Sequence, residues 1–478
     1  VFTNTRYRNN NEDSDETNVN FSTNLIHKFN DKGHELKIDG SVSMSKDKEL
    51  AAISDQTIGD ASNGITTYQR TLNNENENRS LLQADYVLPI GENSKFEAGY
   101  RGSFTTLDND ARAENLVEGN WTNDPNFTNY LEYKEKVNAL YTQFGSKTGK
   151  FSYLLGLRWE DSNIDVNLLN TGDYNNKKYN NFFPSAFLTY EFNQNTNASI
   201  NYSRRINRPR GRFLNPFSGL ESNINIFKGN PDLNPSYTDA IDIGFLKKWT
   251  KLTLSSSAYI NLTDDPFQFI RRPNGLYIGE TPVIITSPLN IGKEFRLGFE
   301  FNVNYNPFRW WRINGNFNFY RNETEGDYNY SYVDETTGET VNGHLDLNSS
   351  GASWTTRVNS KISLPYKIDW QLNGNYEAPQ NTSQGKRVGV ASANTSFSKD
   401  ILKEKATIGL SIQDIFNSRK MKNETFVNGV SSSYSEMQWR QRQVTLSFTY
   451  RFNMNKNDKQ QQQKQQQQDG GGDEYMGG

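Results

Sequence analysis

The sequence predicts an all-β protein, a transmembrane antiparallel β-barrel, because apolar and polar residues alternate in nearly every segment and tight turns alternate with long polar loops. Between residues 295 and 320, for example, Phe299 and Phe301 fall on one face of a strand, and Glu300 and Asn302 fall on the other. Only 34% of residues are hydrophobic and the mean hydropathy is -0.84, yet aromatic residues reach 13%. This combination is unusual for a soluble globule or a disordered chain.

The alternation recurs along the chain. In residues 34–47, Leu36 and Val42 share one phase, and in 251–263 the even positions are apolar while the odd positions are polar. The pattern predicts about 17 to 18 strands, and the ends of each strand are placed to within a few residues. The expected strands cover 17–29, 34–47, 78–90, 94–107, 131–147, 149–162, 181–193, 196–206, 235–248, 251–272, 283–305, 309–323, 351–365, 368–378, 387–399, 404–416 and 435–453.

The connections between these strands differ in length at the two ends. Tight turns are expected at 30–33, 91–93, 147–150, 306–308 and 365–367, and long polar loops at 48–77, 108–130, 163–180, 207–234, 324–350 and 417–434. In outer-membrane barrels, short turns face the periplasm and longer loops face the outside. We therefore expect ligand or partner recognition at the long-loop rim.

Aromatic residues gather at the predicted short-turn rim, where amphipathic rings favour the membrane interface. The predicted interface aromatics are Trp249, Phe308, Trp310, Trp311, Tyr366, Trp370, Tyr450 and Phe452. In this interpretation lipid contacts the apolar phase of each strand, and the Asn-rich phase faces the lumen.

Soluble sandwiches and propellers are also built from alternating strands. Their strands are usually about five or six residues long, whereas most of those expected here are longer, which favours the barrel. No run of 18 apolar residues is present, which excludes spanning helices. The chain has no cysteine for disulfides or thiolate metal sites, and its net charge of -3 gives no reason to expect a nucleic-acid partner.

Three motifs carry a family resemblance. The segment YSRRINRPRGRFLNPFSGLESNINIFKGNPDLNPSYTDAIDIGF at 202–245 resembles the mid-barrel signature of TonB-dependent receptor-like outer-membrane proteins of the Bacteroidota. IQDIFNSR at 412–419 and LSFTYRF at 446–452 resemble the last two strands of such barrels. The resemblance covers nearly the whole chain and implies a barrel of about 22 strands, a plug domain inside it and a TonB-contacting segment before the plug.

None of those N-terminal parts is visible in the sequence. The first and last expected strands run in the same direction, an odd count in a class that is normally even, and VFTNTRYR resembles the top of an ascending strand. We therefore expect a barrel over 1–453 that is incomplete at its N-terminus, with further strands, a plug and a signal peptide upstream. Residues 454–478 are expected to form a disordered, Gln/Gly-rich periplasmic tail.

Two groups of side chains are candidates for ligand or partner contact. The densest charge cluster consists of Arg204, Arg205, Arg208, Arg210 and Arg212. These arginines either pair with acids of the plug or wall, or form a cationic rim that attracts an anionic ligand or lipopolysaccharide phosphates.

The second group is Tyr328, Tyr330 and Tyr332, which alternate along the loop at 324–350. Their rings would suit stacking on sugars or contact with a protein neighbour. A merely solvated loop explains the same pattern.

The sequence shows no catalytic constellation, so an enzyme is not expected. His27, His34 and His344 lie far apart, and we expect no metal site or cofactor. The acidic stretches at 11–16 and 108–110 offer carboxylates that suit Ca²⁺, but solvated loop acids are the favoured explanation.

Two functions in the bacterial outer membrane remain open. The first is a TonB-dependent receptor that binds a solute with its extracellular loops and imports it through a plugged barrel. The alternative is a structural or accessory barrel subunit of a larger outer-membrane complex without transport activity; an open porin is a third option. The expected partners are outer-membrane lipid and lipopolysaccharide, TonB through an upstream segment, and other outer-membrane proteins or surface lipoproteins.

Overall fold

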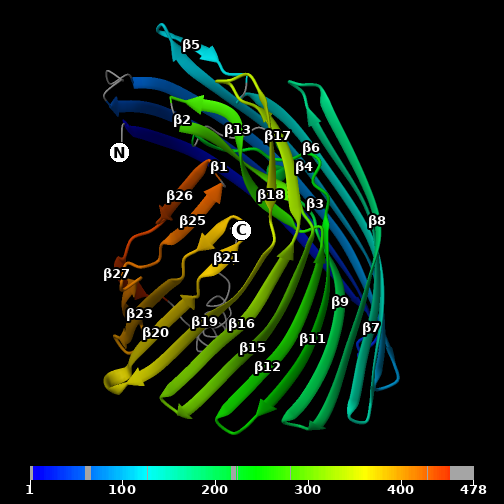
Figure 1. Ribbon diagram of the computed structural model, residues 1–478. Helices are drawn as coiled ribbons and strands as arrows, with labels where there is room; N and C mark the ends of the chain where they lie inside the picture. Colours follow the sequence, from blue (N-terminus) through cyan, green and yellow to red (C-terminus); the bar gives the residue numbers. More distant parts are fainter. Residues whose placement is uncertain are drawn as a thin grey trace.

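The computed structural model describes residues 4–59, 66–125, 127–216, 222, 224–279, 281–427 and 429–452. Figure 1 shows these residues as a tall wall of tilted strands that curves around a central space. The predicted tail at 454–478 lies outside the described residues. No helix in the described part of the chain is long and apolar enough to cross a membrane.

The wall is a single 18-stranded sheet in which neighbouring strands run antiparallel. Its strands are β1 (Asn4–Lys28), β2 (Glu35–Gly59), β3 (Thr66–Ile90), β4 (Ser94–Val117), β5 (Asn120–Asn123), β6 (Asn129–Thr148), β7 (Phe151–Leu168), β8 (Asp173–Asn193), β9 (Thr196–Asn207), β11 (Ser236–Lys248), β12 (Leu252–Asp264), β15 (Lys293–Phe308), β16 (Trp311–Glu325), β19 (Ser349–Leu364), β20 (Ile368–Glu377), β23 (Val390–Ile401), β24 (Ala406–Gln413) and β27 (Gln443–Tyr450). β5 is a short addition at the end of β4. This architecture confirms the predicted all-β barrel class.

The pairing of β15 with β16 confirms the predicted faces. Phe299 lies opposite Phe319, and Asn302 lies opposite Asn316. The side chain of Phe299 is 46% exposed on the outer face. On the other face, the Asn316 amide donates hydrogen bonds to Glu300 at 2.9 Å and to Asn302 at 2.8 Å. The Asn-rich phase is thus a hydrogen-bonded layer on the inner side of the wall.

The tight turns lie together at one end of the wall, drawn at the bottom of Figure 1. Gly91 and Gly149, in the turns after β3 and β6, have φ of 66° and 57°, a left-handed conformation that glycine adopts without strain. The turn after β19 is the 3₁₀ segment η1 (Pro365–Lys367). β15 continues through residues 306–308, where the NPF turn was predicted, and the chain reverses at 309–310 instead.

Several of the predicted long loops are wrong, because the strands continue through most of their length. β2 runs on to Gly59, β4 to Val117 and β7 to Leu168, while β3 begins at Thr66. The sequence at the start of the chain is also part of the long strand β1, and not a separate ascending strand. In these extensions the outer face becomes largely polar, while the inner face carries buried apolar residues such as Ile53, Ile164 and Val166. Backbone pairing therefore continues after the lipid-facing alternation has ended.

Two predicted strands each prove to be two strands. Residues 251–272 contain β12 and the start of β13 (Phe267–Ile278), and residues 283–305 contain most of β14 (Thr281–Asn290) and then β15. The predicted final strand at 435–453 likewise contains the end of β26 (Ser431–Met437) and β27. In each case the apolar alternation is shared by a wall strand and a strand of a separate small sheet.

Three small sheets stand at the long-loop end of the wall. The first contains β10 (Asn225–Phe227), β13 and β14; the second is the hairpin of β17 (Asp327–Val333) and β18 (Thr340–Asp346). The third contains β21 (Gln380–Thr382), β22 (Gly385–Arg387), β25 (Met421–Val427) and β26. Together we call these sheets the cap.

The two outermost wall strands pair along one side only. β1 pairs with β2, and β27 pairs with β24, and no pairing joins β1 to β27 within the described residues. The apolar side chains of both edge strands are correspondingly open, with Phe21 68% and Leu446 76% exposed.

Candidate functional site at the long-loop end

A segment between β9 and β11 packs against the inner face of the wall. It contains the single-turn helix α1 (Gly211–Leu214), and its side chains Leu214 and Leu233 are 1% and 0% exposed. They join a buried apolar cluster with Ile164 and Val166 on β7. The predicted loop at 207–234 is thus anchored inside the wall at both ends, and we call residues 208–216 and 228–235 the strap.

An ion pair fixes the entry of the strap. The Arg208 guanidinium donates to Glu160 at 2.5 Å and to Ser162 at 2.7 Å, and both partners lie on β7. At the far end, Lys177 on β8 donates to the backbone carbonyl of Leu233 at 2.6 Å. These contacts hold the strap across the inner wall, where apolar packing alone would leave its backbone polar groups unpaired.

Hydrogen bonds between distant segments join the first and third small sheets of the cap. The Arg271 backbone N–H on β13 donates to the Gln384 side-chain oxygen at 2.8 Å, and the Gln384 amide donates to the Arg271 carbonyl at 2.8 Å. The Arg271 guanidinium also donates to Thr425 on β25. Burial lowers the pKa of Arg271.

The predicted tyrosines form a stacked row on β17. The Tyr328 and Tyr330 ring centroids are 6.2 Å apart with an interplanar angle of 14°, and Tyr330 and Tyr332 are 6.2 Å apart at 12°. Tyr330 lies opposite Gly343 on β18. A Cβ at Gly343 would fall 2.2 Å from the Tyr330 Cζ atom, so only glycine lets the ring lie across the hairpin.

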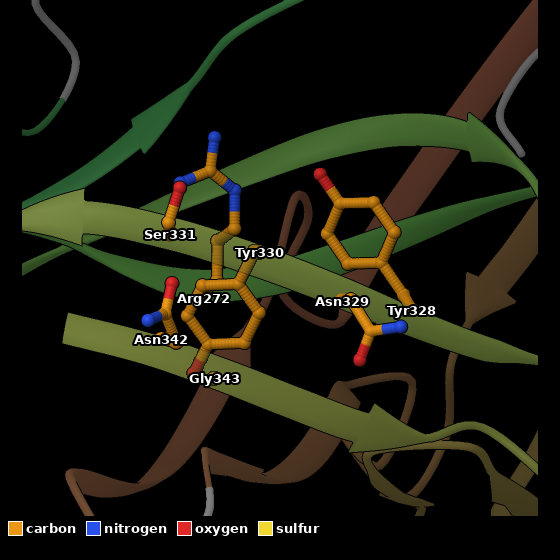
Figure 2. Close-up of a pocket in the computed structure, with 7 residues that line it drawn as sticks. All are labelled: Arg272, Tyr328, Asn329, Tyr330, Ser331, Asn342 and Gly343. Atoms are coloured by element: carbon orange, nitrogen blue, oxygen red, sulfur yellow. The ribbon is translucent and has the colours of Figure 1, made fainter.

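A cavity of about 610 Å³ opens beside this row (Figure 2). Its lining residues are Arg272, Tyr328, Asn329, Tyr330, Ser331, Asn342 and Gly343. The Arg272 guanidinium carbon lies 6.0 Å from the Tyr330 ring centroid. Within the described chain, no carboxylate pairs with Arg272, so its charge is open to the cavity. Burial raises the pKa of the Tyr330 hydroxyl, which keeps it a neutral hydrogen-bond donor.

The tip of the hairpin is fixed to β13. The Glu335 backbone N–H donates to the Gly275 carbonyl at 2.9 Å, and the Tyr277 hydroxyl donates to Asp334 at 3.0 Å. Hydrogen bonds from the Thr337 backbone, and then from Tyr277, hold the pKa of Asp334 below its usual value. The hairpin that forms one wall of the cavity is therefore braced against β13.

The structure does not gather the five predicted arginines into one surface. Arg204 pairs with Asp239 at 3.0 Å, Arg205 donates to Ser203 at 3.2 Å, and Arg208 pairs with Glu160. Arg212 lies over the Phe227 ring at 5.7 Å, and Arg210 precedes α1 as its N-cap residue. Whether any of them contacts a ligand stays a prediction, as it does for the tyrosines. No pattern in the sequence indicated Arg272, because Tyr330, the ring that it contacts, lies far along the chain on a different small sheet.

The predicted interface aromatics all lie at or near the short-turn end. Phe308 and Trp310 stack with ring centroids 5.1 Å apart, and Trp310 is 6.0 Å from Trp311. Tyr366 is 83% exposed in the η1 turn. The others are Trp249 after β11, Trp370 near the start of β20, and Tyr450 and Phe452 at the end of β27.

Among the described residues, no group of three or more His, Asp or Glu side chains is arranged to hold a metal ion. His34 contacts the Tyr86 hydroxyl at 2.9 Å and His344 contacts Asn329 at 2.9 Å, so these two histidines are engaged locally. The acidic stretches at 11–16 and 108–110 lie on β1 and β4, and not in loops.

Comparison with known proteins places this geometry in context. Residues 27–450 match the model of the outer membrane protein beta-barrel family. No curated protein sequence matches the chain. The ferric-catecholate import receptor of Escherichia coli K12 superposes with a TM-score of 0.63 at 15% identity, covering 92% of this chain and 64% of the receptor.

The ferric yersiniabactin uptake receptor of Yersinia pestis superposes with a TM-score of 0.53 at 13% identity, covering 88% of this chain and 62% of the receptor. The chain thus spans a little under two thirds of the length of these two receptors. A copper transporter superposes with a TM-score of 0.55 at 10% identity, covering 91% of this chain and 72% of the transporter. At such low sequence identities, the structural similarity shows a shared fold alone.

Proposed function

Because the chain belongs to the outer membrane protein beta-barrel family and its place is the bacterial outer membrane, we propose that it is an import receptor that captures a solute in its cap. The observation that carries the proposal is the cavity in which the Arg272 charge stands unpaired beside stacked tyrosines. Such a site suits an anionic solute with a flat part, because the guanidinium supplies directed charge and the rings supply stacking area.

The strap and the braced cap support the same function. An open diffusion pore needs an unobstructed lumen, whereas here Leu214 and Leu233 anchor a segment against the inner wall. Import through such a barrel requires energy, and we propose that TonB supplies it through a segment outside the described residues. The receptors with similar folds take up ferric chelates, so a metal chelate is the first solute to test. The resemblance of residues 202–245 supports a source among the Bacteroidota.

Uptake by whole cells tests this function. Cells carrying Arg272→Gln would be supplied with radioactive iron as ferric citrate or as a ferric catecholate, and compared with wild type. We expect uptake of the transported chelate to fall about tenfold or more, since a hydrogen bond to a charged group contributes about 1.5–3 kcal/mol. Arg309→Gln, which removes a positive charge in the turn between β15 and β16, is the matched control. Equal uptake by both variants and wild type would exclude the cavity as the binding site.

A second function, the accessory subunit, is favoured by the surface of the third small sheet. Around β26, Phe426, Tyr434 and Trp439 are 49%, 59% and 76% exposed. Exposed aromatic residues at a free strand edge suit contact with another outer-membrane protein or a surface lipoprotein. Cross-linking from position 434 in intact cells separates the two functions: a stoichiometric protein partner without any chelate uptake would favour the accessory role.

A further inference from the structure

The outer face of the wall changes chemistry at one level. On β2 the outward residues from Leu36 to Met44 are mostly apolar, and this stretch matches the about 9 to 11 residues with which a tilted strand crosses a membrane. The next outward residues are Lys46 and Lys48. On β1 the same change from apolar to polar outward residues falls between Val19 and Thr17. The boundary marks where lipid chains end and head groups begin.

Directly above this boundary, outward polar residues of five strands lie in two registered rows. One row crosses β1, β2, β3, β4 and β6, with one residue from each strand paired to the next: Asp15, Lys48, Asn74, Asp110 and Tyr130. In the other row Thr17, Lys46, Asn76 and Asp108 are successive partners across β1 to β4. We call these nine residues the outer ledge. They line a hollow of about 480 Å³, to which Asp47 also contributes.

Most side chains of the outer ledge have donors and acceptors to spare. In the described part of the chain, no hydrogen bond or ion pair engages the side chains of Asp15, Lys46, Lys48, Asn74, Asn76 and Asp108. The outward residues on β7 and β8 differ, since Asn176 donates to Asn163 at 2.8 Å and to Asp165 at 2.6 Å. The outer ledge is thus a hollow with unused polar groups, whereas the neighbouring wall satisfies its own.

The composition of the outer ledge decides which ligand fits. The ledge holds two lysines and three acids, of which Asp110 is already paired with Arg112 on β4 at 2.8 Å, so the hollow has no excess of positive charge to attract a bare phosphate. A sugar suits the hollow better, because each hydroxyl both donates and accepts and can match amide, carboxylate and ammonium groups in turn. The hollow also adjoins the apolar residues that face lipid. We propose that the outer ledge binds sugar residues of outer-leaflet glycolipids, whose acyl chains pack on the apolar surface below.

Lipid retention tests the proposal. The full chain would be placed in phosphatidylethanolamine nanodiscs that contain a lipid A–core glycolipid, and native mass spectrometry would count the glycolipids that stay bound on release. The combined variant Asn74→Ala/Asn76→Ala/Asp108→Ala should retain about tenfold less, since several hydrogen bonds are lost together. The control Asn163→Ala/Asn176→Ala, on the same outer face, should retain as much as wild type.

Three further arms separate the sources of binding. The same glycolipid without its phosphates should be retained like the intact one, while phosphatidylglycerol and the soluble core oligosaccharide should be retained weakly. Weaker retention of the dephosphorylated glycolipid, or strong retention of phosphatidylglycerol, would show that lipid phosphate charge determines binding and would overturn the proposal. Equal retention of the soluble sugar, or equal losses in the control and the test variant, would also overturn it. If the combined variant fails to assemble, Asn74→Ala/Asn76→Ala makes the same comparison.

Discussion

At the scale of single residues, the side of the wall decides what a side chain tolerates. Phe299 is exposed on the outer face, while Asn302, on the inner face, accepts a hydrogen bond from Asn316. Both positions lie on β15, three residues apart, and pair with the same two strands, β12 and β16, so they differ chiefly in the face that they occupy. Their difference therefore isolates the effect of the face.

This contrast gives a first prediction. Phe299→Arg should destabilise the folded barrel by about 2–4 kcal/mol if the position lies near the bilayer midplane, because a charge then faces hydrocarbon. Asn302→Arg should be tolerated better, since it faces a polar interior. Urea titration of refolding into lipid vesicles measures both values. Equal folding free energies for the two variants would mean that the faces are assigned incorrectly.

A second residue-scale prediction concerns the strap. Arg208→Ala removes the hydrogen bonds to Glu160 and Ser162, although Glu160 keeps its ion pair with Arg158. We expect faster amide hydrogen exchange at Phe213 and Asn215, whose N–H groups donate to backbone carbonyls within the strap. The control is Arg205→Ala, which loses a hydrogen bond to Ser203 on its own strand. Unchanged exchange in Arg208→Ala would show that apolar packing alone holds the strap.

At the scale of elements, the sequence predicted the wall strands well and the cap poorly, for physical reasons. Lipid requires alternation, so β15 and β16 are visible in the pattern. The alternation also continues past the end of β12, which hid the start of β13. Asp265, with φ of 53°, and the following Pro266 form the break. A similar break is Gly292, with φ of 59°, between β14 and β15.

Only the tyrosine side of the candidate cavity could be predicted from the sequence, for a related reason. The spacing of Tyr328, Tyr330 and Tyr332 places them on one face of any strand, and the structure shows them stacked. Arg272 comes from a different small sheet, and only tertiary packing brings it to the tyrosines. The extensions of β2 and β7 were missed because their apolar residues, such as Ile53, Ile164 and Val166, lie on the inner face, so the lipid-facing alternation ends there although the backbone ladder continues.

The hairpin itself carries the third prediction. Gly343→Val should displace Tyr330, because the Cβ atom would meet the ring. We expect the stack to open, and the affinity for a solute bound in the cavity to fall about tenfold. Gly338→Val, at the tip of the same hairpin, is the control: a Cβ there meets no atom within 4 Å, and its positive φ of 70° makes it the more strained backbone change. Tyrosine fluorescence and solute titration measure the effect, and equal affinities for both variants would contradict it.

At the scale of the whole molecule, the wall and the cap obey different constraints. Backbone groups in hydrocarbon must be paired, because each unsatisfied group costs several kcal/mol. Within the described residues, the outer sides of β1 and β27 carry backbone groups that no strand pairs. The cap stands in water, where loops and small sheets vary without this constraint. We therefore expect that recognition can be removed from this protein without loss of the barrel.

The hairpin of β17 and β18 allows the cleanest such removal. The Leu347 backbone N–H donates to the Gly326 carbonyl at 3.0 Å, so the two ends of the hairpin already meet. Replacing residues 327–346 with Asn-Gly should leave β16 paired with β19 and the barrel intact, because an Asn-Gly turn suits a two-residue connection. Unheated and boiled samples should still differ in mobility on a denaturing gel, while solute uptake is abolished.

The deletion separates recognition from folding because it removes the tyrosines together with one side of the cavity. It also removes Leu345 from the apolar cluster with Ile270 and Ile291, so the rest of the cap is expected to loosen while the wall holds. Equal mobility of heated and unheated samples would mean that the hairpin is needed for barrel assembly. Full uptake by a heat-modifiable variant would place recognition elsewhere at the long-loop end.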